Sequence, residues 1–128
     1  MATEIESRYL VPDRIIFDKL LSLETLGDYA LQPQGKLKLC DRYLDTKGRA
    51  LLRQGWACRL RSQEGAWLLT IKGPRNVQGA VMSRPEWETP LPGRIENVSE
   101  WPVGPMRDRV RELSGNLPLL PIATIKQT

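Results

Sequence analysis

Alternating polar and apolar side chains open the chain and predict a strand over residues 2–11. In the stretch TEIESRYLVP, Glu4, Glu6 and Arg8 share one face. The other face is mostly apolar. The pattern therefore predicts a strand with one charged face, which either meets solvent at a sheet edge or lines a polar cavity enclosed by strands.

A helical period replaces the alternation after Pro12. Asp13 is a favourable N-cap, because its carboxylate can accept a backbone N–H of the first helical turn. The spacing of apolar residues predicts a helix to about Leu26, and Gly27 ends it. The apolar face of this helix consists of Ile15, Ile16, Leu20 and Leu23.

The rest of the chain alternates between predicted strands and short helices. Strands are predicted over residues 36–46, 56–62, 66–73 and 80–91, and a last one begins in PLLPIATIKQT. Residues 56–62 and 66–73 form a hairpin that turns at Gln63-Glu64-Gly65. Pro85 cannot donate a ladder hydrogen bond, which favours an edge position or a bulge for its strand. Residues 48–55 read as a helical turn, and 104–115 as an amphipathic helix with Met106, Val110 and Leu113 inward.

The charged face of the first strand recurs in WACRLRS, WLLTIKG and SRPEWETP, where the opposite face is mostly apolar. Four strands thus place nine charged residues on one side, namely Arg8, Arg59, Arg61, Lys72 and Arg84 with Glu4, Glu6, Glu86 and Glu88. Arginine binds phosphate oxygens through two parallel hydrogen bonds, and carboxylate pairs bind hard divalent cations. If the sheet curls with these faces inward, it encloses a polar tunnel that suits a polyphosphate and its metal, and the two predicted helices cover part of the apolar outside.

Two other interpretations of this surface stay open on pattern alone. Each strand by itself is typical of a solvated face of an antiparallel sheet. A basic sheet can also bind RNA, but no aromatic side chain interleaves with the basic residues on the charged face. Trp56, Trp67 and Trp87 lie on the other side or in loops, and we expect them in the outer core.

The composition of the chain excludes some kinds of site and favours others. The chain has 128 residues, which suits one domain over residues 1–128, and its net charge of +4 weakly favours an anionic partner. It contains no histidine, which excludes histidine zinc sites and histidine general-base catalysis. Cys40 and Cys58 lack metal-ligand spacing, and two free thiols are expected. No apolar run reaches the roughly 20 residues that span a bilayer, and no signal peptide opens the chain, so we expect a cytoplasmic protein.

Three blocks of sequence, in order, resemble one known family. EIESR resembles the ExExK motif that opens the CYTH superfamily, also called triphosphate tunnel metalloenzymes, which joins class IV adenylyl cyclases and thiamine triphosphatases. Residues 43–74 resemble the next block of that family, with Tyr-x-Asp-Thr, Arg-x-Arg and Leu-Thr-x-Lys-Gly strands, and RPEWETPL (84–91) is similar to its Arg-x-Glu-x-Glu strand. The resemblance implies an α+β fold in which antiparallel strands form a tunnel with flanking helices.

The resemblance also implies a reaction and its residues. Members hydrolyse inorganic triphosphate, thiamine triphosphate or nucleoside triphosphates with a divalent metal, here Mg²⁺ or Mn²⁺, and a few cyclise ATP. Carried over residue by residue, Glu4, Glu6, Glu86 and Glu88 are the catalytic acids, of which Glu4, Glu6 and Glu88 ligate metal, and Glu86 and Glu88 can also position basic residues through ion pairs. The phosphate-binding residues are Arg8, Arg59, Arg61, Lys72, Arg84 and Lys126.

Two departures from the family pattern matter. Arg8 stands where the family usually has lysine, and a planar guanidinium does not replace an ammonium geometrically. The chain ends at Thr128, so we expect it to hold the N-terminal two-thirds of the domain. It is then either a triphosphatase or class IV-type cyclase, a non-catalytic polyphosphate or nucleotide-binding module, or, least favoured, a nucleic-acid-binding sheet. Open sheet edges predict self-association of two chains, and no membrane partner is expected.

Overall fold

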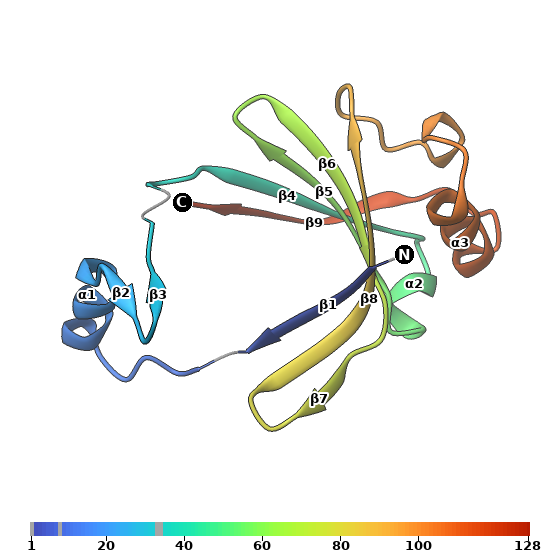
Figure 1. Ribbon diagram of the computed structural model, residues 1–128. Coiled ribbons are helices and arrows are strands. Elements are labelled where there is room, and N and C mark those ends of the chain that lie inside the picture. Colours follow the sequence, from blue (N-terminus) through green and yellow to red (C-terminus); the bar gives the residue numbers. More distant parts are fainter. Residues whose placement is uncertain (1, 8, 33–34) are drawn as a thin grey trace.

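The computed structural model describes residues 2–7, 9–32 and 35–128. Within these ranges seven strands form one antiparallel sheet in the order β1-β8-β6-β5-β4-β9, with β7 also paired to β8 (Figure 1). Its strands are β1 (Ala2–Ser7), β4 (Leu39–Asp45), β5 (Ala57–Gln63), β6 (Ala66–Lys72), β7 (Asn76–Gln78), β8 (Val81–Leu91) and β9 (Leu120–Gln127). The predicted α+β class with an antiparallel sheet is confirmed, and the sheet is not closed. β1 and β9 are the outermost strands of this order.

The core lies between one face of the sheet and two helices, α2 (Ala50–Arg53) and α3 (Pro105–Ser114). Leu60 and Leu69 are completely buried on the sheet side, and Val110 is completely buried on α3. The predicted inward positions of the late helix are confirmed, because Met106, Val110 and Leu113 are all buried. Trp56, Trp67 and Trp87 pack against this core as partly buried residues, as predicted.

The strand ends that flank the core are fixed by side chains. Asp45, at the end of β4, accepts hydrogen bonds from the backbone N–H groups of Thr46 and Leu51 through Oδ1 and of Leu52 through Oδ2, at 2.7–3.0 Å. It thereby satisfies N–H groups that the short helix α2 leaves without intrahelical partners. The hairpin between β5 and β6 turns at Glu64 and Gly65, both with positive φ, close to the predicted position.

Of the two positions predicted for Pro85, the edge is wrong, but an irregularity like a bulge is present: the pairing of β8 shifts by one residue beside Pro85, from Lys72↔Glu86 in β6 to Asn76↔Ser83 in β7. β8 lies inside the sheet between β1 and β6, and its register with both neighbours is continuous. The proline is tolerated because its missing N–H faces the break between β6 and β7, where the Pro85 carbonyl accepts from the Gly73 N–H at 2.8 Å. Gly73 must be glycine here, since a Cβ would collide with Pro85 and press on the ring of Trp56.

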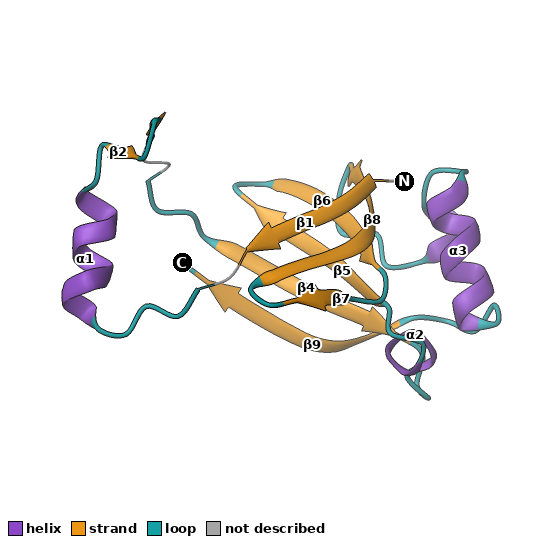
Figure 2. Cartoon of the chain, turned by 60° about the horizontal axis from the view of Figure 1, so that its bottom comes forward, coloured by secondary structure: helices purple, strands orange, loops and turns teal. Residues whose placement is uncertain are grey.

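The N-terminal helix begins as predicted but ends earlier and packs differently. Asp13 Oδ1 accepts from the Ile16 N–H at 2.9 Å, which confirms the N-cap, and α1 spans Arg14–Ser22. Residues predicted to continue the helix instead form a small hairpin, β2 (Thr25–Leu26) and β3 (Tyr29–Ala30), which turns at Gly27 and Asp28. No residue of α1 is buried, so the expectation that this helix covers the sheet is wrong. Figures 1 and 2 place α1 and α2/α3 at opposite ends of the molecule.

Two further sequence expectations bear on chemistry. Both cysteines are free thiols, and burial raises the pKa of the Cys58 thiol, which makes it unreactive. None of the helices in the described ranges combines the length and apolar content needed to cross a membrane.

Candidate functional site

The strand register gathers the predicted charged residues on the face of the sheet that points away from the core. Directly opposed residues of antiparallel strands point to the same side. Glu4 pairs with Arg84, Lys72 with Glu86, Thr70 with both Glu88 and Arg59, and Arg61 with Asp41. The alternate residues of β5 and β6, including Leu60 and Leu69, are in the core. The face on which Glu4, Arg59, Arg61, Lys72, Arg84, Glu86 and Glu88 lie is called the charged face below.

Lys72 links two strands at the centre of the charged face. Its Nζ lies 2.5 Å from Oε2 of Glu4 on β1 and 3.6 Å from Oε2 of Glu86 on β8. All three side chains are at least three-quarters buried. Water screens this pair of contacts less than it screens surface ion pairs, so the arrangement holds one ammonium between two carboxylates.

The pKa values of the Glu4 and Glu86 carboxyl groups are shifted in opposite directions. Hydrogen bonds from Glu86 and from Lys72 lower the pKa of Glu4 to about 2. The pKa of Glu86 is raised to about 7, first by its hydrogen bond to Glu4, then by burial, and then by Glu88. These opposed shifts are typical of carboxylates that crowd one another and indicate an excess of negative charge at this point of the charged face.

Glu4 and Glu86 suit the binding of a hard divalent cation whose remaining ligands come from a bound phosphate. In the described residues no three acidic, cysteine or histidine side chains gather closely enough to hold a metal ion by themselves. Magnesium, however, is commonly held by one or two carboxylates together with substrate phosphates. Glu4 and Glu86 supply oxygen donors of this kind around one point, and their crowded negative charge favours a cation there.

Arg61 and Arg59, neighbours on β5, differ in how their guanidinium groups are satisfied. Asp41 accepts two hydrogen bonds from Arg61, from Nε at 2.7 Å and from Nη2 at 2.8 Å. Asp41 is buried, and the Arg61 guanidinium lowers its pKa. Arg59 faces Tyr43 and Thr70 across the strands, and its buried Nε has no hydrogen-bond partner. Arg61 is therefore held in place, whereas Arg59 has an unused donor for an anion.

Sequence reasoning missed Asp41. It lies two residues before Tyr43 in the same strand, and the hairpin register places it opposite Arg61. A buried aspartate facing an arginine of a predicted neighbouring strand is a signal that the pairing of residues 36–46 with 56–62 could have given.

Arg84, Glu6 and Glu88 are also on the face, in different surroundings. Arg84 is buried, donates from Nε to the Gly73 carbonyl at 3.0 Å, and has its pKa lowered by burial and by Arg75. Glu6 is half-buried opposite Met82. Glu88 is exposed and accepts from the Thr70 hydroxyl at 3.5 Å. Arg84 therefore has part of its donor set committed to the backbone.

One predicted phosphate ligand, Lys126, does not join the charged face. Lys126 pairs with Cys40, whereas the flanking positions of that strand, Asp41 and Leu39, belong to the other side, so the register places Lys126 on the opposite face. This placement corrects the prediction that Lys126 binds phosphate alongside the others. Arg8 lies outside the described residues.

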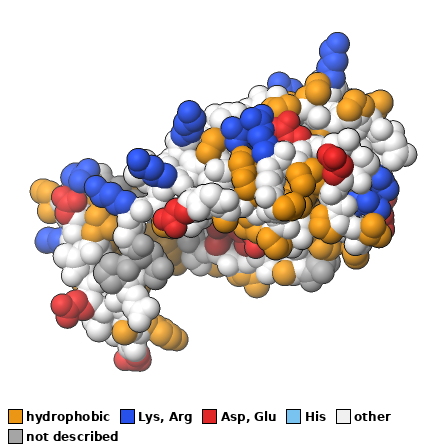
Figure 3. Space-filling model, turned by 90° about the horizontal axis from the view of Figure 1, so that it is seen from above, with side chains coloured by type: hydrophobic (Ala, Val, Ile, Leu, Met, Phe, Trp, Pro, Cys, Tyr) orange, Lys and Arg blue, Asp and Glu red, His pale blue; other side chains and the backbone are white. Residues whose placement is uncertain are grey.

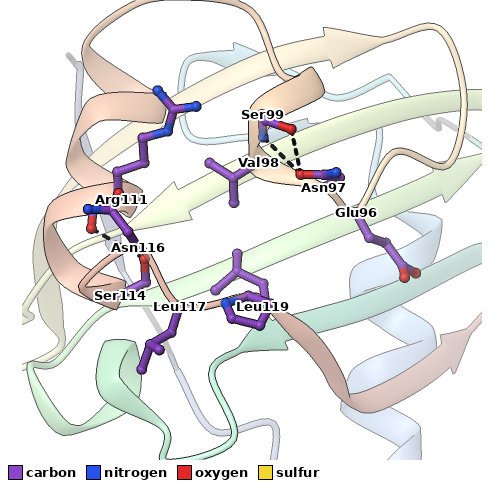
Figure 4. A pocket seen from close by; sticks show the side chains of 10 residues that line it. Glu96, Asn97, Val98, Ser99, Arg111, Ser114, Asn116, Leu117 and Leu119 are labelled. Carbon is purple, nitrogen blue, oxygen red and sulfur yellow. Dashed lines mark hydrogen bonds between the residues drawn. The ribbon is translucent and has the colours of Figure 1, made fainter.

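A separate cavity lies on the helix side of the molecule. It has a volume of about 630 Å³ and lies between the short helix η1 (Val98–Glu100) and the end of α3 (Figure 4). Asn97, Arg111 and Leu119 are among its lining residues. It contains none of the predicted site residues, and the charged face is therefore the better candidate for the predicted chemistry.

Comparisons with solved structures agree with the fold. No curated protein matches the chain. Among solved structures, the chain is similar to candidate adenylate cyclases from Bacillus halodurans (22% identity, TM-score 0.53, 97% of this chain and 62% of that one) and Vibrio parahaemolyticus (18%, 0.52, 97% and 58%). It is also similar to a candidate adenylyl cyclase from Hippeastrum described as having a dominant triphosphatase activity (14%, 0.55, 70% and 50%). The chain thus spans about half to three-fifths of the length of these proteins.

The sequence model of the CYTH domain matches residues 2–128, which is nearly the whole chain. The strands that carry the three motif blocks are the strands that form the charged face. The chain therefore belongs to the CYTH domain family, a family of metal-dependent tunnel enzymes, as its motifs predict.

Proposed function

We propose that the charged face binds an inorganic or organic triphosphate and that the chain hydrolyses its terminal phosphoanhydride with Mg²⁺ or Mn²⁺. The observation that carries the proposal is the convergence of Arg59, Arg61 and Lys72 with Glu4 and Glu86 on one side of adjacent strands. The family membership and the triphosphatase activity described for the Hippeastrum protein support the same reaction class.

The residues divide the work by charge. Arg61, fixed by Asp41, and Arg59, with its unpaired Nε, are placed to donate hydrogen bonds to phosphate oxygens. Lys72 adds a positive charge between them and the acids. In the reaction, water adds to the terminal phosphorus, the P–O bond to the leaving diphosphate breaks, and the basic residues stabilise the negative charge that spreads over the oxygens.

Glu4 and Glu86 would hold the divalent cation, with Glu88 close by on β8. When bound, the cation supplies positive charge and Lewis acidity to the phosphate oxygens. Lys72 occupies part of the same space as an ammonium, so we expect it to turn toward phosphate when cation and substrate bind.

The test is phosphate release from inorganic triphosphate by this chain with Mg²⁺, with Mn²⁺ and without metal. We expect metal-dependent release that falls roughly a hundredfold or more in Glu4→Gln/Glu6→Gln, since metal-site and charge-stabilising groups contribute at this level. The matched control is Glu100→Gln/Glu112→Gln, which removes the same charge from exposed positions on the helix side.

Three other outcomes have distinct meanings. Release that the charged-face variant leaves unchanged would contradict the proposal. Metal-dependent triphosphate binding in calorimetry without release would replace it by the binding-module function. Formation of cyclic AMP from ATP, with diphosphate as the other product, would replace hydrolysis by the class IV cyclase reaction on the same face.

A further inference from the structure

Residues 9–31 form an arm that stands apart from the sheet and leaves its apolar side chains in solvent. The arm contains α1 and the β2–β3 hairpin, and Figure 3 shows it as a lobe beside the rest of the molecule. Twelve of the twenty exposed large hydrophobic residues in the described chain lie on it. They are Tyr9, Leu10, Val11, Ile15, Ile16, Phe17, Leu20, Leu21, Leu23, Leu26, Tyr29 and Leu31.

The helix of the arm has a wide apolar surface and a narrow polar one. At 100° per residue, only Arg14, Asp18 and Ser22 form a continuous polar strip. Arg14 Nε and Asp18 Oδ1 are ion-paired at 2.9 Å along it. The remaining circumference is apolar except for Lys19. A stripe of this width is typical of a helix that is packed on more than one side.

The exposed area of the chain is that of a molecule with a missing contact. The chain exposes 9177 Å². A compact monomer of 14.6 kDa exposes roughly 6,900 Å², so the excess is roughly 2,300 Å² per chain. Two chains that bury their excess against each other hide roughly 4,600 Å², which lies in the range of obligate homodimers.

The rest of the molecule, here called the body, has further exposed apolar side chains, most of them on strands of the sheet. Five of its eight exposed large hydrophobic residues are on β1, β7, β8 or β9, namely Ile5, Val77, Val81, Leu120 and Ile125. The outermost strands thus expose large apolar side chains beside their open edges, one on β1 and two on β9. Charge is complementary, because the arm has two basic and four acidic residues and a net charge of −2, which leaves +6 on the body.

We propose that two copies of this chain exchange their arms, with residues 9–31 of each copy packed on the outer strands of the other. Both members of the contact are on one chain, so a two-fold arrangement satisfies both at once. Because β1 and β9 flank the charged face, the exchanged arms close its open sides. The proposed interface depends only on surface shape and charge, so its test is independent of the test of the triphosphatase reaction.

The first test is the mass of the intact chain in sedimentation velocity and light scattering from micromolar concentration upward. We expect twice 14.6 kDa. Leu20→Asp, on the apolar stripe, is expected to raise the dissociation constant roughly a hundredfold, about tenfold for each of the two copies it alters. Ser22→Asp adds the same charge on the polar strip of the same helix and should leave the dimer intact. A monomer at 100-fold higher protein concentration, or a dimer indifferent to Leu20→Asp, would overturn the proposal.

A mixing experiment separates arm exchange from simple pairing of two arms. The body variant Ile5→Asp/Leu120→Asp alters exposed positions on both outer strands and is expected to be monomeric, as is the arm variant Leu20→Asp. Mixed, the intact arm of the first can pack on the intact body of the second, so a heterodimer forms. Pairing of arm with arm gives no such recovery, and lack of recovery would reject the exchange. Because all altered side chains are exposed, circular dichroism should show that every variant keeps the wild-type fold. If the wild type binds phospholipid vesicles and does not dimerise, the arm binds a membrane surface and the proposal is rejected.

Discussion

The two longer amphipathic helices of this chain, α1 and α3, have similar lengths but differ in burial. α3 has ten residues, of which Met106, Val110, Leu113 and Ser114 are buried, and it completes the core. α1 has nine residues, five of them large and apolar, and none of them is buried. The more apolar helix is therefore the more exposed one.

The comparison shows that periodicity indicates a helix and an apolar face but not the surface that covers it. α3 follows β8 and precedes β9, so the chain returns it to the apolar face of the sheet. α1 follows the outermost strand β1, and the chain then leaves the sheet until β4. The described residues of the body therefore leave the apolar face of α1 uncovered.

The comparison is tested most strongly by one substitution made in both helices. Leu113→Ala removes a buried side chain from α3 and is expected to lower the free energy of unfolding by about 3 kcal/mol, from lost transfer energy and the cavity left behind. Leu20→Ala in α1 should cost under about 1 kcal/mol in a dilute, monomeric sample, because its side chain is half-exposed. Urea denaturation of both variants measures the difference. Equal losses would mean that α1 is packed on the body after all.

The ion pairs of the two regions give a second, smaller contrast. Asp41 is buried and makes a two-point contact with Arg61, whereas the Arg14–Asp18 pair of α1 is exposed. Asp41→Ala leaves the largely buried guanidinium of Arg61 unpaired, and we expect the free energy of unfolding to fall by about 2 kcal/mol. Asp18→Ala should cost at most about 0.5 kcal/mol.

The stability lost in Asp41→Ala should be smaller at low pH. Arg61 lowers the pKa of Asp41 in the folded protein, so the stabilisation by this pair is present above the ordinary aspartate pKa. It disappears as pH falls through the pKa of the folded state. Denaturant titrations of wild type and variants at pH 7 and pH 3 would show this, and a loss independent of pH would contradict it.

Much of the sheet could be predicted because its strands combine two signals. In β5, β6 and β8 the apolar residues alternate with charged ones, and the family motifs fall on the same residues. The pairing of Arg61 with Asp41 was missed because it depends on the register between two strands, which alternation alone does not fix. Lys126 was included through the resemblance alone, and the register of β9 with β4, which no motif indicates, places it on the other face.

The helix α1 was predicted too long, and an edge position was wrongly allowed for Pro85, because both features depend on neighbouring segments. Thr25 pairs with Ala30 and Leu26 with Tyr29 in a hairpin around Gly27 and Asp28, and this local pairing ends the helical pattern before Leu26. The missing N–H of Pro85 faces a gap between two strands, which no property of its own strand indicates.

The crowding of Glu4, Glu86 and Glu88 predicts a pH dependence of stability that has no counterpart in the arm. The pKa of Glu86 is raised to about 7, so its folded form retains a proton that the unfolded chain loses near the ordinary glutamate value. Stability due to this group is therefore fully present below about pH 4.5 and is lost as pH rises to about 7. Glu86→Gln should flatten that part of the stability profile, whereas Glu100→Gln should leave it unchanged. If both variants keep the wild-type slope between pH 5 and 7, the crowding of Glu4, Glu86 and Glu88 is not present in solution.

The smallest effect is expected at the N-cap of α1. Asp13→Ala removes the acceptor for the Ile16 N–H, a change that costs about 1 kcal/mol of local helix stability. In the dilute monomer the global unfolding free energy should hardly change, because the core does not include α1. Hydrogen exchange should nevertheless speed up about fivefold for amides of residues 16–20, which open locally. In the dimer, packing of the arm on the partner ties the helix to the assembly, so the same substitution should then weaken association. A fall in global stability of the dilute monomer equal to the local cost would instead show that arm and body unfold as one unit.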